Sequence, residues 1–192
     1  MQINYETIVV TEEITLTEIR ASDIFSMVQY LNEKDFNRNT CTIPYPYLEE
    51  DALEFIKMVR AFEKKNNLQK DWAIRDSKEK LIGCIGILYD HGIKSHRSQI
   101  GYWLGKPFWN QGIISKVIGV FTQYIFTHRS LVRLEGHVFG YNPFSCKALE
   151  KAGFRQEGFL EWAQCKDGKY LDLYIYAKVN REIRTGVPQK DL

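Results

Sequence analysis

Residues 81–89 read LIGCIGILY, an almost unbroken apolar run between charged and polar neighbours. The run is too short for a typical core helix, and it lacks the alternation of a strand with one wet face. Continuous apolar strands are typical of sheets that are covered on both faces. The run therefore predicts a central strand, and it requires helices on both sides of the sheet that contains it.

The periodic segments around this strand predict one mixed sheet. Helical patterns cover residues 24–31, 51–65, 113–126 and 142–153. Strand patterns cover residues 71–75, 81–89, 99–104, 131–139, 154–160 and 169–178, and residues 8–19 alternate as a strand or bent hairpin. We expect an α+β (α/β) fold with a mostly antiparallel sheet of six to seven strands. The strand–helix–strand unit at 99–138 should form a right-handed parallel crossover.

Length and composition exclude several classes of protein. The 192 residues fit one domain, which we place at 1–180, with a polar C-terminal tail at 181–192. A formal net charge of +2 without a basic cluster argues against nucleic-acid binding. No apolar run approaches the ~20 residues that cross a bilayer, and no secretion signal is visible. We expect a cytoplasmic protein that contacts no membrane.

The cysteines give no sign of a metal site. They lie at Cys41, Cys84, Cys146 and Cys165, without a CxxC pair and without the Cys/His spacing of zinc fingers. We therefore expect no metal and four reduced thiols. Cys146 suggests an acyl-enzyme, but no histidine and carboxylate partners accompany it in the sequence, so a thiol on a helix face is the better interpretation.

The stretch FWNQGIISKVI at 108–118 places Gly112 between a strand and an apolar helix. Glycine weakens a helix interior, so this residue belongs near the helix start. There the first amides have no helical partner and the dipole is positive, which favours phosphate groups if the backbone can be approached. The Walker A and GxGxxG patterns are both absent. The alternative is a helix cap with a glycine that serves packing only.

The stretch YNPFSCKALEKAGF at 141–154 predicts a second, well-delimited helix. Asn142 is a favoured N-cap, Pro143 suits the first turn, and Gly153 stands where a C-terminal glycine belongs. As local structure this helix is complete without a functional role.

Together these stretches resemble the GNAT superfamily of N-acetyltransferases, and most closely its RimJ/RimL-like branch of ribosomal-protein N-terminal acetyltransferases. The resemblance rests on IGYWL at 100–104, PFWNQG at 107–112, RLE at 133–135, NPFS at 142–145 and LEKAGF at 149–154. It covers nearly the whole chain, and the order and spacing of the pieces are more specific than any one of them.

The resemblance implies a GNAT fold in which the central parallel strands, at 99–104 and 131–138, splay apart. It implies acetyl-CoA as co-substrate, with pantetheine between those strands and the pyrophosphate on residues 111–115. The residues that would bind acetyl-CoA are Tyr102, Trp103, Leu104, Asn110, Gln111, Gly112, Ile113, Ile114, Ser115, Asn142, Ser145, Lys147 and Lys151.

The implied reaction is direct attack of an amine on the thioester in a ternary complex. Ser145 would protonate the leaving thiolate. Glu135 and His137 share one strand face, and either is a candidate base. A salt bridge between Glu135 and Arg133, and a simply hydrogen-bonded His137, are the favoured alternatives. The backbone N–H of Leu104 is a candidate donor to the thioester carbonyl.

The acceptor is expected to be a primary amine of a protein N-terminus or a small molecule, framed by the loops at 36–50 and 160–170. Acids in or directly beside these loops, including Asp35, suit a cationic acceptor. The protein would be a monomer or homodimer. Two other functions remain open: a non-enzymatic acyl-CoA-binding module, which Gln99 and Ile114 favour as departures from the family pattern, and a transferase that uses another acyl-CoA.

Overall fold

The computed structural model describes residues 3 and 5–183. Within these residues one eight-stranded sheet has the strand order β1-β2-β3-β4-β5-β6-β8-β7. Its strands are β1 (Ile8–Val9), β2 (Thr15–Thr17), β3 (Asp71–Arg75), β4 (Leu81–Ile87), β5 (Arg97–Leu104), β6 (Arg133–Phe139), β7 (Arg155–Lys166) and β8 (Lys169–Val179). All neighbours are antiparallel except β5 and β6. The expected mixed sheet with one central parallel pair is confirmed.

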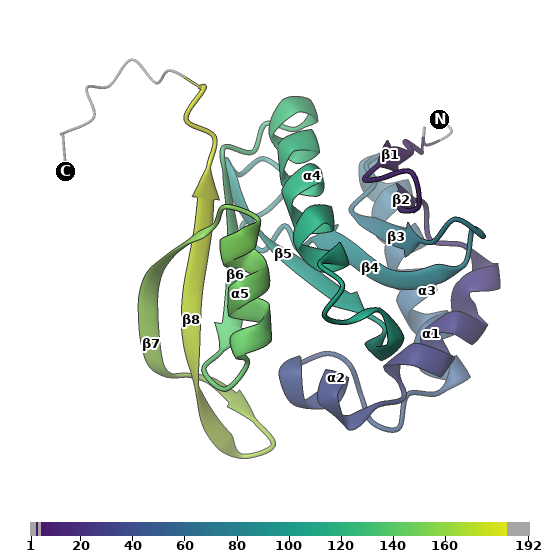
Figure 1. Cartoon of the computed structure of the whole chain (residues 1–192), viewed down its shortest axis with the longest axis horizontal. Coiled ribbons are helices and arrows are strands. Elements are labelled where there is room, and N and C mark those ends of the chain that lie inside the picture. Colours follow the sequence, from purple (N-terminus) through teal and green to yellow (C-terminus); the bar gives the residue numbers. More distant parts are fainter. Residues whose placement is uncertain (1–2, 4, 184–192) are drawn as a thin grey trace.

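Helices cover both faces of the sheet (Figure 1). Helices α1 (Ile24–Leu31) and α3 (Glu49–Asn66) lie on one face, over the half formed by the earlier strands. Helices α4 (Ile113–His128) and α5 (Pro143–Lys151) lie on the other face. The short helix α2 (Lys34–Asn39) lies apart from both pairs, at one end of the sheet.

Strand β4 shows why its sequence is apolar throughout. All seven of its residues are buried, because Ile85 belongs to the core beneath α4 while Cys84 belongs to the core beneath α1 and α3. Helix α4 contributes Phe121 to the first core, where its ring meets the indole of Trp72 edge-on at 5.1 Å. The prediction of a strand covered on both faces is confirmed.

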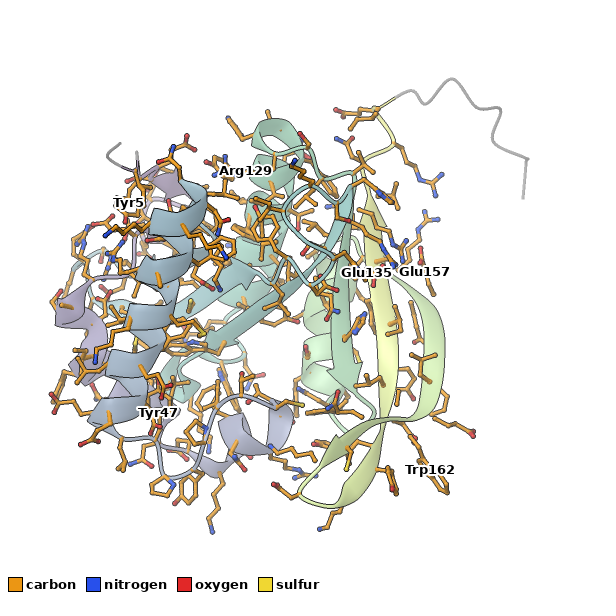
Figure 2. The ribbon with its side chains drawn as sticks, turned by 180° about the vertical axis from the view of Figure 1, so that it is seen from behind. Tyr5, Tyr47, Arg129, Glu135, Glu157 and Trp162 are labelled. Carbon is orange, nitrogen blue, oxygen red and sulfur yellow. The ribbon has the colours of Figure 1, made fainter. Side chains whose placement is uncertain are left out.

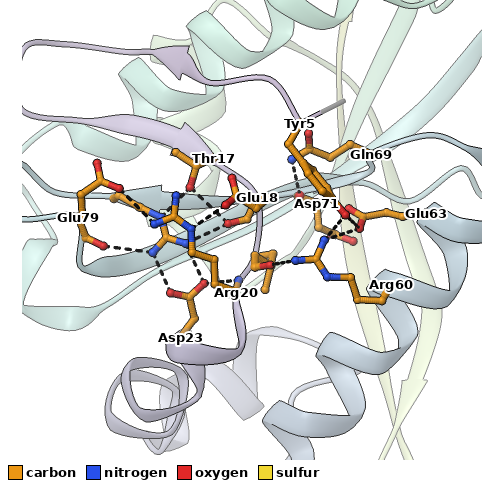
Figure 3. A network of polar contacts seen from close by, with 12 residues as sticks. Tyr5, Thr17, Glu18, Arg20, Asp23, Arg60, Glu63, Gln69, Asp71 and Glu79 are labelled. Atoms are coloured by element: carbon orange, nitrogen blue, oxygen red, sulfur yellow. Dashed lines mark hydrogen bonds and ion pairs between the residues drawn. The ribbon is translucent and has the colours of Figure 1, made fainter. Parts of the chain in front are cut away.

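Buried polar networks fix the first strands and helices to each other (Figure 3). The guanidinium of Arg75 on β3 donates to both carboxylate oxygens of Asp23, at 2.8 and 2.9 Å, and also to the Thr17 hydroxyl. Both charged side chains are almost fully buried, so each depends on the other for its partner. A second network joins Tyr5 and Arg60 to Glu63 on α3, where burial raises the pKa of the Glu63 carboxyl.

The structure differs from the sequence expectation in two places. Eight strands replace six to seven, because residues 8–17 form two short paired strands. Residues 34–39, for which the sequence predicted no helix, form α2, whose Phe36 is buried against the rings of Trp103 and Trp109. A six-residue helix has little intrinsic stability, so this packing holds it.

The sequence also predicted a polar C-terminal tail and no membrane-spanning segment. Of the predicted tail at 181–192, residues 184–192 lie outside the described residues. Across residues 3 and 5–183, no helix combines the length and the apolar character that crossing a bilayer demands.

Candidate active site

The centre of the site is the point where β5 and β6 separate. The two strands pair only from Arg97↔Arg133 to Gln99↔Glu135, although β5 continues to Leu104 and β6 to Phe139. Over those further residues β5 stays paired with β4 and β6 stays paired with β8, so the two halves of the sheet diverge (Figure 1). The splay that the resemblance implied is present.

The pairing of β5 with β4 decides which backbone groups face the opening. The Leu88 amide donates to the Gln99 carbonyl and the Gly105 amide to the Ile82 carbonyl. Because such bonds alternate along an antiparallel pair, the backbone groups of Tyr102 and Leu104 point away from β4. The Leu104 carbonyl accepts a hydrogen bond from the Trp109 indole, which leaves its N–H and both groups of Tyr102 toward the opening.

The start of α4 presents free amides. Asn110 and Gly112 both have positive φ, 61° and 74°, which turns the chain sharply before the helix begins at Ile113. Gly112 is therefore the N-cap, which agrees with the expectation that it lies near the helix start. The first helical bond runs from the Lys116 amide to the Gly112 carbonyl, so the amides of residues 113–115 have no intrahelical partner.

Space is available in front of these amides. An ideal Cβ on Gly112 would meet no other heavy atom of the described chain within 4 Å. The side chains of Ile113 and Ile114 are partly buried and pack against the core beneath α4. Gln111 folds back, and its amide group donates to the Pro107 carbonyl at 2.9 Å. The turn is thus open to an anion, which the helix dipole favours.

Ser145 reaches the opening from α5. Its hydroxyl lies 2.7 Å from the Tyr102 hydroxyl of β5, so the pair joins two elements 43 residues apart in the chain. The Asn142 side chain accepts a hydrogen bond from the Ser145 amide at 3.3 Å, as an N-cap should. Burial raises the pKa of Tyr102 well above its usual range, which keeps the phenol protonated at any physiological pH.

The remaining predicted binding residues lie around this centre. Trp103 faces the opposite side of the sheet from Tyr102, where its ring meets Phe36 edge-on at 6.1 Å. Lys147 and Lys151 are both exposed on α5. Burial raises the pKa of the Cys146 thiol, which makes it a poor nucleophile and argues against an acyl-enzyme.

Glu135 lies in an ionic cluster on the same sheet face as α1 and α3, over the later strands, which those helices do not cover (Figure 2). Its carboxylate accepts from Arg133 at 2.7 Å and from Arg97 at 3.4 Å, and His137 Nε2 lies at 3.1 Å. The expected salt bridge with Arg133 is confirmed. Burial alone would raise the pKa of Glu135, but the hydrogen bonds from Arg133 and His137 outweigh it and lower the pKa. A carboxylate this acidic is a weak base.

Helix α2 connects the two diverging halves of the sheet. On the β5 side, Lys106 forms ion pairs with Glu33 and Asp35 at 2.9 and 2.8 Å. On the other side, the Arg38 carbonyl accepts from the hydroxyl of Tyr141, which follows β6. Lys166, at the tip of the β7–β8 hairpin, donates to backbone carbonyls on either side of the C-terminus of α2. The short helix therefore closes one end of the opening.

Sequence reasoning missed two features of this site. The Tyr102–Ser145 contact has no local signal, because neither residue type nor spacing tells which strand an N-terminal helical turn will meet. The role of α2 was also missed, although the lone aromatic Phe36 in a polar segment was the one available hint. In residues 3 and 5–183, no group of three or more His, Cys, Asp or Glu side chains is arranged to hold a metal ion.

The chain is similar in sequence to known proteins. The model of the acetyltransferase (GNAT) domain family matches residues 13–155. The N-acetyltransferase p20 of Bacillus licheniformis, described as uncharacterised, is 26% identical over 173 residues, which cover 90% of this chain and 96% of that protein.

Two solved structures share the fold. One is RimL, a ribosomal L7/L12 alpha-N-protein acetyltransferase in complex with coenzyme A, with a TM-score of 0.78, 19% identity, and coverage of 91% of this chain and 98% of that one. The other is the microcin C7 self-immunity acetyltransferase MccE in complex with acetyl-CoA and AMP, with a TM-score of 0.78, 23% identity, and coverage of 88% and 94%. The family match, the parted central strands and the open helix start lead to one conclusion: the chain belongs to the GNAT acetyltransferase family and is an acetyltransferase.

Proposed function

We propose that the protein transfers an acetyl group from acetyl-CoA to a primary amine of a peptide N-terminus or a small molecule, by direct attack in a ternary complex. The observation that carries the proposal is the open α4 start beside strands that part after Gln99↔Glu135. Acetyl-CoA as the donor is supported by the coenzyme A bound to RimL and the acetyl-CoA bound to MccE.

The free backbone groups support a binding position for each part of acetyl-CoA. The pyrophosphate would accept hydrogen bonds from the amides of residues 111–115, with Asn110 shaping the turn. The pantetheine arm would pair with the backbone of Tyr102 and with the Leu104 amide, where β6 no longer does so. Lys147 and Lys151 are exposed cations on α5, four residues apart on one helix face, and would contact the 3′-phosphate.

The Tyr102–Ser145 pair would supply a proton to the leaving thiolate. Ser145 faces the opening and Tyr102 holds its hydroxyl at 2.7 Å, so a proton passed by Ser145 can be replaced from the phenol. A thiolate is a much stronger base than an ionised carboxylate, and it needs such a donor in a site with little water. Asn142 fixes Ser145 by capping α5, which is a positioning role.

The acceptor would enter on the side that α2 and the β7–β8 hairpin enclose. The argument for a cationic acceptor is weakened at Asp35, because Lys106 pairs with that carboxylate at 2.8 Å. Arg38 is engaged as well, since its guanidinium lies over the Tyr141 ring at 4.9 Å. Asp35 therefore supports a cationic acceptor less than the sequence suggested.

A coupled assay tests the proposal. The purified protein is mixed with acetyl-CoA and a panel of short peptides, polyamines and aminoglycosides, and free thiol is followed together with the acetylated product by mass spectrometry. We expect turnover on at least one amine, and none with Gly112→Asp, which places charge and bulk before the amides.

Binding and donor controls accompany this assay. Tight coenzyme A binding without turnover on any amine would instead support the non-enzymatic module. Faster reaction with succinyl-CoA would support another donor. Ile114 is a weaker argument for the module than the sequence suggested, because its partly buried side chain packs against the core beneath α4.

A further inference from the structure

A histidine borders the point where β5 and β6 part. His137 lies on β6 two residues beyond Glu135, the last residue of that strand that pairs with β5. Because side chains alternate along a strand, both face away from α5, whereas a Cβ on Gly136 would press into Leu149 of that helix. His137 and Ser145 therefore approach the opening from opposite faces of the sheet.

The contacts of the pair fix the orientation of the imidazole. His137 Nε2 lies 3.1 Å from one carboxylate oxygen of Glu135, while the other oxygen is held by Arg133 at 2.7 Å. The Glu135 side chain is 8% exposed, and that of His137 is 28% exposed. Among the described residues no hydrogen bond engages Nδ1, so that nitrogen is free for a substrate.

The electrostatics around Glu135 favour a negative carboxylate at neutral pH. Arg97 from β5 and Arg133 from β6 both contact it, Glu157 from β7 pairs with Arg133 at 2.6 Å, and the β8 neighbour of His137 is the apolar Ile175. An anionic carboxylate accepts a hydrogen bond from Nε2–H, so the lone pair of the neutral imidazole is on Nδ1. The same carboxylate then stabilises the imidazolium that forms once Nδ1 has taken a proton.

We propose that His137 is the general base that deprotonates the acceptor amine, with Glu135 as its positioning residue. This inference rests on the proposed transfer to an amine. The acceptor ammonium gives one proton to Nδ1 of His137, and the neutral amine attacks the thioester carbonyl. The C–N bond forms and the C–S bond breaks. As coenzyme A departs, the second proton leaves the nitrogen for water, and Ser145 gives its proton to the thiolate. His137 then releases its proton to water, and the Ser145–Tyr102 pair takes up a proton from water to replace the one it gave.

Two opposite faces thus serve two proton transfers. The phenol and hydroxyl at Tyr102–Ser145 act on the side of α5, and the imidazole acts on the other. This separation explains how one opening can remove a proton from the amine and deliver a proton to sulfur without one group doing both.

The kinetic test compares His137→Gln with the wild type on an amine that the panel identifies, over a range of pH. A lost general base lowers kcat by about 100-fold or more at neutral pH. The loss of kcat in His137→Gln should become smaller as the pH approaches the pKa of the acceptor amine. The amine is then already neutral in part and needs no base to remove its proton. Coenzyme A affinity should not change. His91→Gln is the matched control, since His91 pairs with Asp90 at 3.2 Å outside the opening.

Glu135→Gln tests the positioning role. It should lower kcat with little change in KM for either substrate and should shift the pH midpoint of kcat, and Glu135→Asp should restore part of the rate. A deficit of His137→Gln that is constant with pH, or full activity of that variant, would overturn the proposal.

A second readout needs no acceptor. Nitrogen NMR of the imidazole in the free wild-type protein should show the proton on Nε2, and Glu135→Gln should abolish that preference. A proton fixed on Nδ1 would refute the assignment even if no amine is found. Wild-type turnover and coenzyme A binding report separately on the proposed function, so failure of one can be told from failure of the other.

Discussion

The Gly112→Ala variant separates a requirement of the fold from a requirement of the ligand. Gly112 has φ +74°, a conformation in which an L-residue costs about 1–2 kcal/mol. A Cβ there meets nothing within 4 Å in the described chain, so no clash adds to this cost. For a chain of this size, a loss of about 1 kcal/mol lowers Tm by roughly 2–4 °C.

Gly168 provides a matched control. It has φ +72°, its Cβ position is equally open within the described chain, and it lies in the β7–β8 turn. Gly168→Ala should therefore lose a similar amount of stability. Only Gly112→Ala places a carbon in front of the amides at 113–115, and we expect it to weaken coenzyme A binding by about ten-fold or more, or about 1.4 kcal/mol.

Thermal unfolding with and without coenzyme A measures both effects. At a hundredfold excess over Kd the ligand should stabilise the wild type and Gly168→Ala by about 2.7 kcal/mol, which is roughly 5–10 °C. Gly112→Ala should show a smaller shift at the same concentration, and Gly112→Asp none. If Gly112→Ala keeps the wild-type affinity in calorimetry while losing the same stability as its control, the amides at 113–115 do not hold the pyrophosphate.

Three further predictions concern the reaction, the acceptor side and pH. Ser145→Ala should lower kcat more than coenzyme A affinity in steady-state and binding assays; unchanged kcat would leave Ser145 as a helix residue only. Lys166→Met removes the donor to the α2 carbonyls and should raise the acceptor KM several-fold, whereas Lys169→Met, on the same turn, should not. Burial would raise the pKa of Asp90, but hydrogen bonds from Gln99 and Ser98 lower it. Its contribution to the free energy of unfolding is therefore complete above the unfolded pKa, near 3.9, and is lost as pH falls through the lower folded value. Asp90→Asn should flatten the acid side of the stability curve in urea titrations; an unchanged slope would contradict the shift.

The elements that sequence predicted well are those with a strong local signal. The apolar residues 81–87 and the stripe after Gly112 indicate burial directly, because a side chain that must leave water is apolar wherever the chain takes it. Asn142 and Gly153 mark the ends of α5 because capping uses only neighbouring backbone groups. The pairing of Glu135 with Arg133 was also predictable, since residues two apart on a strand share a face.

Features that depend on distant segments were not predictable in this way. Helix α2 has no apolar stripe. It is held by the packing of Phe36 on Trp103 and Trp109, which lie some 70 residues later in the sequence. Strands β5 and β6 part beyond Gln99↔Glu135 because β5 remains paired with β4 while β6 remains paired with β8. Neither strand contains a residue that by itself ends the pairing.

Local sequence is sufficient to specify the buried central strand, the glycine turn before an apolar helix, and the capped α5, since each depends on the dihedral preferences and polarity of adjacent residues. Packing between distant segments is what brings Tyr102 to Ser145, turns His137 to the opposite side of the same opening, and puts α2 across one end of it. Such contacts depend on how the helices pack on the whole sheet. That packing involves residues from all parts of the chain, so no short segment can specify it.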